Sequence, residues 1–298
     1  MIKFINFSIF FFIINLSFAQ NKIKESNNNV INFKGFFNFS YSENKDKIYL
    51  EVNSLNKKFL YVSALSQGVG SNDIGLDRGQ LGVRKIVYFR KAGNKLLLIE
   101  PNLKYIAETR NSLEKKSVNE AFAKSVLHGF KIIDYKNGTY KIDITPFLLK
   151  DRHGITQRLV DRNQGEYIID KSMSSINLDR TKAFEKNIEF DVLLTFVGNA
   201  EGNFIKSVTP SSNNLTVFQH HSFIELPDNK YSPRIFDPRS GANSISFFDY
   251  ASPVTEKTLK QYILRHRLIK KDKNLTLSEP LKPIIYYLDN GVPEPVRS

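Results

Sequence analysis

The sequence predicts a mainly β protein of the α+β class, arranged as two antiparallel sheet blocks with two or three helices. Short runs of β-branched, aromatic and leucine residues recur along the chain, which is typical of strands. Turn-forming residues separate several of these runs, as at residues 92–94 (Ala-Gly-Asn) and 136–138 (Lys-Asn-Gly). The 298 residues include 24 Phe and 13 Tyr, which can fill a core without Cys or Trp.

The first predicted sheet block spans residues 35–155. Its expected strands are residues 47–52, 59–65, 85–91 and 95–99, followed by a hairpin over residues 130–145. In that hairpin, the dipeptide at residues 137–138 (Asn-Gly) favours a type I′ turn, because both positions accept positive φ. Residues 113–127 are expected to form a short helix, since apolar side chains recur there at three- and four-residue spacing.

The second predicted block spans residues 156–280 and joins the first near residues 150–165. Its clearest strand is residues 188–196, in which apolar and polar side chains alternate as in a half-buried strand. Further strands are expected at residues 204–208, 215–226, 231–236 and 244–250. One last strand is expected at residues 283–288, within a separate C-terminal segment that spans residues 281–298.

A basic amphipathic helix is expected over residues 255–271 at the end of the second block. Its apolar stripe runs through Leu259, Tyr262, Ile263, His266 and Ile269. The stripe could pack on the sheet block with the lysines solvated, or lie on an anionic membrane surface. Packing is favoured, because a helix of this length usually gains its stability from tertiary contacts. A membrane surface is therefore not the expected partner.

The N-terminus has the pattern of a secretory signal peptide over residues 1–19. Lys3 supplies the positive charge, an apolar stretch follows, and Ala19 precedes the expected cleavage at Gln20. An uncleaved anchor is the alternative, although the apolar stretch is short for a membrane span. Residues 20–34 are polar and are expected to form a disordered leader. The sequence therefore predicts an exported protein, periplasmic or secreted after cleavage.

The formal net charge of +13 has two interpretations. A solvated lysine-rich surface is the ordinary one. Outside the cytoplasm, a basic surface could also bind acidic glycans or the cell envelope. Nucleic acid is not an expected partner, because the sequence has no recognisable nucleic-acid-binding motif. The lack of Cys excludes a disulfide scaffold, so the protein must rely on a packed core.

Residues 70–82 concentrate four glycines, two aspartates and one arginine between two predicted strands. The candidate functional residues of this stretch are Asn72, Asp73, Gly75, Asp77, Arg78 and Gly79. An EF-hand is excluded, because Gly75, Arg78 and Arg84 occupy positions 3, 6 and 12 counted from Asp73. A structural turn is favoured over metal binding by another geometry, and a loop that docks against another domain is the favoured functional interpretation.

No catalytic residue, metal ligand or cofactor is assigned to this chain. Its five histidines are His128, His153, His220, His221 and His266, and none belongs to a His-Glu-x-x-His motif. In a strand, His220 and His221 would point to opposite faces, so a structural role is favoured over metal binding. Ser222, His221 and Asp228 are close in sequence, but a catalytic triad is assembled across a fold and not from neighbours.

Several segments between residues 35 and 298 occur in the order of a known family. They are residues 70–82, 100–103, 121–127, 143–148, 170–172, 233–239, 248–251, 262–268, 282–289 and 293–297. On these segments the chain resembles the N-terminal, non-catalytic domain of large secreted bacterial zinc-dependent metalloproteases of the zincin class. Residues 240–244 depart from the family pattern. Residues 281–298 resemble the first strand of the catalytic domain, at which the chain would be truncated.

The resemblance implies a function that depends on residues beyond those given. Zinc is implied in a catalytic zincin domain in cis, held by a His-Glu-x-x-His helix downstream. This chain would be an accessory region without enzymatic activity of its own, which supports or gates that domain and shapes the cleft for a peptide substrate. The alternative is a self-standing extracellular binding module for acidic glycans or the cell envelope.

Overall fold

The computed structural model describes residues 22–25, 29–228, 230–289 and 291–297, so the predicted signal peptide over residues 1–19 lies outside the described residues. The chain divides into two units. Unit 1 comprises Met1–Pro101 and Ser125–Leu226, and unit 2 comprises Asn102–Lys124 and Pro227–Ser298. This division differs from the predicted one near residues 150–165, because strands of both predicted blocks hydrogen-bond to each other within unit 1.

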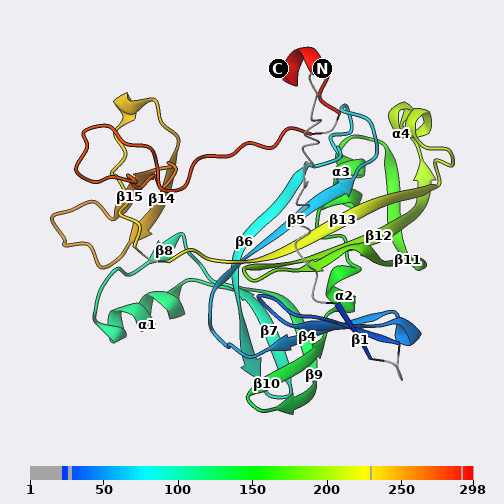
Figure 1. Ribbon diagram of the computed structural model, residues 1–298, viewed down its shortest axis with the longest axis horizontal. Coiled ribbons are helices and arrows are strands. Elements are labelled where there is room, and N and C mark those ends of the chain that lie inside the picture. The colour runs from blue at the N-terminus through cyan, green and yellow to red at the C-terminus, as the bar shows by residue number, and fades with distance from the viewer. Residues whose placement is uncertain (1–21, 26–28, 229, 290, 298) are drawn as a thin grey trace, which may run out of the picture. The chain divides into compact units, whose positions relative to one another are not determined.

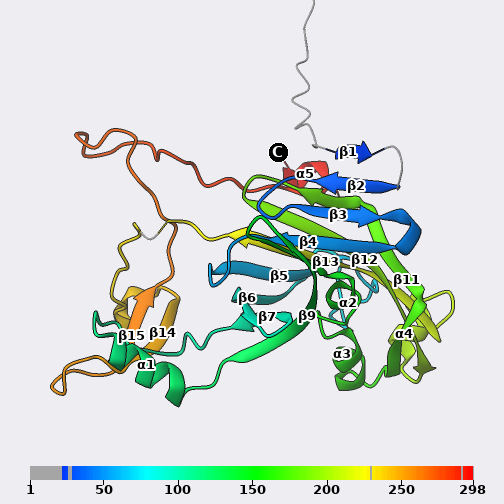
Figure 2. The ribbon, with the colours of Figure 1, turned by 90° about the horizontal axis from the view of Figure 1, so that it is seen from below.

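Unit 1 is built on a large antiparallel sheet (Figure 1). Its strands are β1 (Lys22–Glu25), β2 (Val30–Phe33), β3 (Phe39–Ser42), β4 (Lys47–Val52), β5 (Phe59–Gln67), β6 (Leu81–Ala92), β7 (Lys95–Glu100), β9 (Ser125–Lys136), β10 (Thr139–Asp143), β11 (Gly165–Ala183), β12 (Asn187–Ala200) and β13 (Asn214–Glu225). Within the described residues they form one twelve-stranded sheet in the order β1-β2-β3-β4-β10-β9-β7-β6-β5-β13-β12-β11. Figure 2 shows β2, β3 and β4 lying side by side.

Local turn chemistry explains two of the hairpins in this sheet. Asn137 and Gly138 join β9 to β10 with φ values of 50° and 79°, so the predicted type I′ turn is confirmed. Gly93 has a φ of 57° and, with Asn94, joins β6 to β7. The strands predicted at residues 47–52, 59–65, 85–91 and 95–99 are confirmed as β4, β5, β6 and β7.

The helices of unit 1 are short and lie in the connections between strands. They are α2 (Thr145–Leu148), α3 (Ile155–Asp161), α4 (Asn203–Val208) and the 3₁₀ turn η1 (Glu43–Lys45). Phe147 and Leu148 of α2 are fully buried, as are Ile155 and Leu159 of α3. These helices therefore add apolar side chains to the core of the sheet.

Unit 2 contains a small mixed sheet and the helix α1 (Ser112–Ala121). Strand β14 (Ser244–Asp249) pairs antiparallel with β15 (Leu259–Ile263) and parallel with β8 (Tyr105–Ile106). The ring of Tyr105 stacks on Phe122 at 4.1 Å and on Phe248 at 5.4 Å between centroids. The 3₁₀ turn η2 (Pro238–Ser240) and the helix α5 (Glu294–Arg297) complete the regular elements that the structure describes in this unit.

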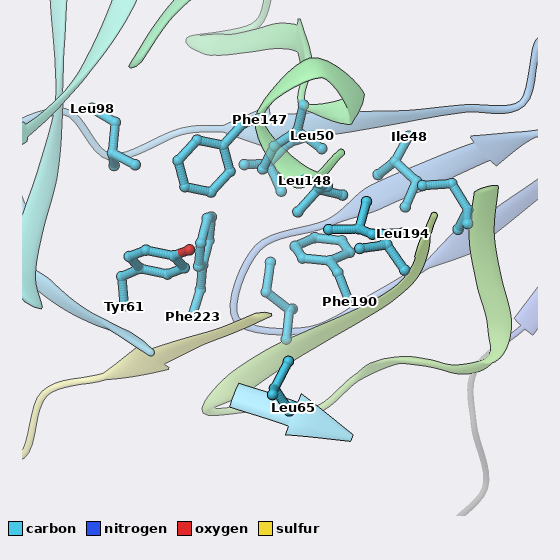
Figure 3. Close-up of a cluster of buried hydrophobic side chains, with 14 of the residues drawn as sticks. Ile48, Leu50, Tyr61, Leu65, Leu98, Phe147, Leu148, Phe190, Leu194 and Phe223 are labelled. Atoms are coloured by element: carbon cyan, nitrogen blue, oxygen red, sulfur yellow. The ribbon is translucent and has the colours of Figure 1, made fainter. Parts of the chain in front are cut away.

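The core of unit 1 is rich in aromatic side chains from both halves of the sheet (Figure 3). Phe190 of β12 and Phe223 of β13 are fully buried, and Figure 3 shows them near Phe147 of α2. Phe39 of β3 meets Phe190 edge-on, with ring centroids 4.9 Å apart. Burying one such side chain contributes about 1.5–3 kcal/mol, so the aromatic cluster explains how a chain without disulfides is stabilised.

Three predictions for unit 1 need correction. Residues 22–25 and 30–33 fall in the predicted disordered leader over residues 20–34, yet they pair as β1 and β2. Residues 204–208 are not a strand but part of α4, because the side-chain oxygen of Gln164 accepts a hydrogen bond from Ile205 N at the start of the helix. The strand predicted at residues 188–196 exists within β12, but it is buried on both faces: Asp191 is 0% exposed.

Three further corrections concern the segments near and within unit 2. The helix predicted over residues 113–127 ends at Ala121, and residues from 125 onward belong to β9 because they pair with β7. The helix predicted over residues 255–271 is absent from the described chain. Its centre forms β15, which pairs with β14 on one side and donates from Ile263 N to Arg234 O at 2.9 Å on the other. Long-range hydrogen bonding therefore overrides the helical pattern.

Two predicted strands of the C-terminal half are not regular strands in the structure. Of residues 231–236, only Ile235 takes part in a ladder, as a single bridge to Tyr262. Residues 283–288 belong to no strand within the described chain. Composition suits both segments to a sheet, but a strand also requires a neighbour that supplies hydrogen bonds.

Candidate functional site

The glycine-rich loop connects β5 to β6 at residues 68–80 and is tied to the sheet by main-chain hydrogen bonds. Val69 N donates to Leu76 O at 2.8 Å, and Gly79 N donates to Leu65 O at 2.7 Å. Ile74 and Leu76 are buried and anchor the loop in the core. The loop is therefore a packed turn and not a loose connection.

The outer side of the loop carries most of the candidate docking residues. Asn72, Asp73, Arg78 and Gly79 are exposed, whereas Gly75 and Asp77 are half-buried. Gly75 and Gly79 have φ values of 73° and 81°, a region that favours glycine. Backbone geometry thus explains why glycine occupies these two positions. Four of the six candidate residues are exposed and could contact another domain. The docking role of these residues stays a prediction.

The helix α3 lies against this loop and is fixed by Asp151. A Cβ built on Gly75 would lie 3.6 Å from Nη1 of Arg158, so the Arg158 side chain reaches the loop. One Asp151 oxygen accepts from Gly154 N at 2.7 Å and Ile155 N at 2.9 Å. The other accepts from the main chain and hydroxyl of Thr156. This carboxylate satisfies the orphan donors at the start of α3.

Replacing Asp151 with Ala should lower the free energy of unfolding by about 1–2 kcal/mol, because three main-chain donors lose their acceptor. Urea denaturation followed by circular dichroism measures the loss. Asp161→Ala, at the exposed end of α3, is the matched control and should change stability by less than about 0.5 kcal/mol. Equal stabilities of the Asp151 variant and the wild type would contradict the capping role.

A buried polar network lies beneath the loop and centres on Gln219 of β13. Its side-chain oxygen accepts from Arg152 N at 2.8 Å and His153 N at 2.9 Å, while its nitrogen donates to Lys150 O at 2.8 Å. The ring of His153 in turn meets the Gln80 side chain at 3.1 Å. One glutamine thus holds the segment before α3 to the sheet, and His153 connects it to the end of the loop.

His221 belongs to the same network and lies in the core. Its Nδ1 is 3.0 Å from the Tyr61 hydroxyl, and its Nε2 is 3.1 Å from Leu148 O and 3.0 Å from Gln219 Nε2. Burial lowers the pKa of His221 to about 3, so the ring is neutral at physiological pH. With both nitrogens engaged, His221 is a structural residue, as the sequence indicates.

Arg152 completes this region by lying over an aromatic ring. Its guanidinium carbon is 4.2 Å from the ring centroid of Phe147, and burial lowers its pKa. Among the described residues, Nη2 of Arg152 and Nδ1 of His153 are buried without a hydrogen-bond partner. The network is therefore rich in contacts but not completely satisfied.

A second polar cluster lies on the opposite face of the sheet and joins β12 to β13. Nδ1 of His220 is 3.0 Å from Oδ1 of Asp191, and Nε2 of His220 is 2.8 Å from Oε2 of Glu189. The His220 side chain is 24% exposed, while those of Glu189 and Asp191 are 15% and 0% exposed. Burial disfavours the charged ring, but the hydrogen bonds and charges of the two carboxylates outweigh it and raise the pKa of His220 to about 9.

Neighbouring side chains hold the two carboxylates of this cluster. Asp191 accepts from the Ser66 hydroxyl at 2.6 Å and from Asn177 Nδ2 at 2.8 Å. Glu189 accepts from the Ser222 hydroxyl and from Asn187 Nδ2 at 2.5 Å. Because β5, β11, β12 and β13 all contribute, the cluster ties four adjacent strands together.

The chemistry open to this cluster is limited by its own hydrogen bonds. Both nitrogens of His220 face carboxylates, so the ring offers no free lone pair to a proton or a metal ion. Within the described residues, no group of three or more His, Asp or Glu is arranged to hold a metal ion. We interpret the cluster as an ionic clamp between strands.

The structure also shows where the two adjacent histidines and the neighbouring Ser222 and Asp228 lie. His220 and His221 point to opposite faces of β13, as predicted. Ser222 donates to Glu189 on the outer face, and Asp228 accepts from Arg267 Nη1 at 2.6 Å. Because Ser222 and His221 lie on opposite faces of β13, they do not form the nucleophile and base pair of a catalytic triad.

Sequence reasoning missed the clamp and the network around Gln219. The strand pattern assigned Glu189 and Asp191 to a solvent-facing side, and nothing in the pattern indicated that His220 lies directly opposite Asp191. The only local signal was the pair of acidic residues spaced two apart in an otherwise apolar strand.

Two family models match the chain. Residues 79–271 match the family described as Domain of unknown function (DUF5117), and residues 26–68 match the one described as Domain of unknown function (DUF5118). No curated protein and no solved structure matches it. The two matched segments are not separate domains, because β5 of the shorter match pairs with β6 and β13 of the longer one. Within the described residues, no helix is long and apolar enough to cross a membrane.

Proposed function

We propose that the chain, which belongs to the family described as Domain of unknown function (DUF5117), is a non-catalytic accessory region of an exported zinc-dependent metalloprotease. In this role it supports or gates a catalytic zincin domain in cis. The ordered segments from residue 70 to residue 297 that resemble this protease class support the proposal. The signal-peptide pattern over residues 1–19 supports export.

The observation that carries the proposal is an exposed apolar run at residues 284–288. Ile285 is 63% exposed, Tyr286 81% and Tyr287 90%, and the whole run is Ile284, Ile285, Tyr286, Tyr287 and Leu288. The segment belongs to no strand and has no strand partner within the described chain. Exposed apolar runs of this kind mark interaction sites.

The alternation of side chains indicates how this run would be buried. In an extended segment, successive side chains point to opposite faces, so five consecutive apolar residues make both faces apolar. Such a strand suits a sheet that is covered on both sides, as in α/β proteins. We therefore infer that residues 284–288 complete the sheet of a catalytic domain, which agrees with the resemblance of residues 281–298 to its first strand.

The glycine-rich loop is the second contact that we assign to the catalytic domain. It is held rigidly by Ile74, Leu76 and its main-chain hydrogen bonds, while Asn72, Asp73 and Arg78 are exposed. A surface that is already ordered loses little conformational entropy when a partner binds. This geometry supports a docking loop.

The first test uses the purified chain alone. It should hydrolyse no peptide and should hold no stoichiometric zinc after incubation with zinc and dialysis. Peptide hydrolysis that requires zinc bound to this chain would refute the accessory role. Sequencing the gene past codon 298 should show an open frame that encodes a His-Glu-x-x-His motif; an in-frame stop codon there would also contradict it.

The second test uses the longer protein encoded by that open frame. Replacing Tyr286 and Tyr287 with Asp should abolish protease activity and expose residues 284–288 to limited proteolysis, because charges cannot enter a sheet that is covered on both faces. Tyr135→Asp is the matched control, since Tyr135 is also exposed (57%) but lies in the β9–β10 hairpin. Full activity of the double variant would contradict docking through this run.

A further inference from the structure

A groove of about 510 Å³ lies on the sheet surface formed by β3, β4, β10 and β9 of unit 1. The core side chains of these strands point to the other face, as Phe39, Leu50 and Ile142 do. Alternation therefore places their sequence neighbours Ser40, Tyr49 and Lys141 on the groove side. The groove residues used below are Ser40, Ser42, Lys45, Tyr49, Asp134 and Lys141.

Two serine hydroxyls in this groove have no partner in the protein. Ser40 and Ser42 are each only 7% exposed, and both line the groove. In the part of the chain that the structure describes, neither hydroxyl makes a hydrogen bond. Neither hydroxyl oxygen belongs to the fully buried unpaired atoms of the described residues, so both can be reached from the groove. The two hydroxyls are therefore available to a ligand that carries hydrogen-bonding groups.

Two lysines give the groove a positive character. The ammonium of Lys141 lies 5.2 Å from the ring centroid of Tyr49, a cation–π contact that places it over the groove. Lys45 lines the groove from the end of η1. Among the described residues, neither ammonium has a carboxylate oxygen within 4 Å. Unpaired cations next to free hydroxyls favour a ligand with an anionic oxygen group.

One acidic residue narrows the class of ligand. Asp134 also lines the groove, and its Oδ1 accepts only the local main-chain bond from Tyr135 N at 2.8 Å. A carboxylate can accept bonds from ligand hydroxyls, so Asp134 favours a ligand that carries hydroxyls beside its acid group. A ligand with one negative charge per unit and several hydroxyls meets both conditions.

We propose that this groove binds an acidic sugar unit of an extracellular polysaccharide, with a uronic acid as the simplest case. The sugar carboxylate lies between Lys45 and Lys141, and the sugar hydroxyls bond to Ser40, Ser42 and Asp134. The groove volume falls in the range of small-ligand sites, about 300–1,000 Å³. Because the groove is concave and the serines lie at low exposure, a flat membrane surface cannot reach them. The proposal does not depend on the protease role.

The test is isothermal titration calorimetry of the purified chain with oligogalacturonate and with a neutral oligogalactoside of equal length. We expect saturable binding of the acidic oligomer only, weakened by added salt. Lys141→Ala should reduce the affinity by about tenfold, since a charge-assisted bond is lost. Ser42→Ala should reduce it by a smaller factor. Lys131→Ala is the matched control, because Lys131 is an exposed lysine of β9, the strand that pairs with the β10 strand of Lys141, but does not line the groove.

Each other outcome would overturn the proposal. If the wild type does not bind oligogalacturonate saturably, the groove is not a binding site for an acidic sugar. Equal losses in the Lys141 and Lys131 variants would show diffuse attraction by the +13 charge instead of a groove. Equal binding of the neutral oligomer would remove the requirement for an acid. Binding to vesicles of anionic phospholipid that is lost in Lys141→Ala, without oligomer binding, would assign the groove to lipid headgroups.

Discussion

Replacing Phe223 with Ala is expected to lower the free energy of unfolding of unit 1 by about 3–5 kcal/mol. The Phe223 side chain is fully buried and lies among five other aromatic rings. Their centroids lie between 5.1 and 6.4 Å from that of Phe223, and the rings are Phe37, Phe59, Tyr61, Phe147 and Phe190. Removing the central ring loses its burial and leaves a cavity that rigid aromatic neighbours cannot close.

The measurement is urea denaturation, with the transition midpoint and its slope fitted separately. An unchanged slope together with a lower midpoint would show a loss of stability without a change in the surface exposed on unfolding. Phe204→Ala is the matched control, because Phe204 lies in α4 and is 46% exposed. A loss below about 1 kcal/mol for the Phe223 variant would mean that the aromatic cluster is not the centre of stability.

The sequence predicted the parts of the fold that depend on local chemistry. The type I′ turn at Asn137 and Gly138 needs two residues that accept positive φ, and both have it. The strands of the first half follow from runs of β-branched and aromatic residues between such turns. For these elements the local preference and the tertiary structure agree, so the pattern alone is sufficient.

The elements that depend on distant partners could not be predicted in the same way. Residues 259–263 have helical spacing of apolar side chains, but they form β15 because β14 and Arg234 supply hydrogen bonds on its two sides. Residues 204–208 look like a strand, but Gln164, which lies far away in sequence, accepts a bond from Ile205 N at the helix start. The same limit applies to the division into units, which follows long-range pairing.

The candidate sites also differ in whether local chemistry or distant partners determine them. The position of the glycine-rich loop between two strands was predictable, because glycine clusters interrupt strands. The ionic clamp of His220 was not, because it requires the register that places Asp191 opposite His220. Strand register between β12 and β13 is set by the buried faces of both strands and not by any local motif.

The ionic clamp of His220 with Glu189 and Asp191 predicts that the free energy of unfolding falls at alkaline pH. The pKa of His220 is raised from 6.5 to about 9 in the folded protein. A raised pKa means that the folded state binds the proton more tightly than the unfolded state. The extra stability is therefore fully present below pH 6.5 and is lost as the pH rises through about 9. The difference of pKa corresponds to at most about 3 kcal/mol.

This pH window separates His220 from the other buried histidines. Burial lowers the pKa of His221 to about 3, that of His128 to about 4 and also that of His153, so all three favour the neutral form in the folded state. Their effect on stability appears below about pH 7.5, where the unfolded state binds the protons more tightly. Between about pH 7.5 and pH 9, the slope of stability against pH should therefore report mainly on His220.

The experiment measures the free energy of unfolding by urea at several pH values between about 7.5 and 9. The wild type should lose stability steadily across this range, whereas His220→Gln should be less stable at the lower end and nearly independent of pH. Gln is the suitable replacement, because it can still donate to one carboxylate but cannot carry the charge. If the wild type and the variant show the same slope, the imidazolium of His220 does not hold β12 to β13. The clamp would then be a set of neutral hydrogen bonds, whose loss costs less than that of charged ones.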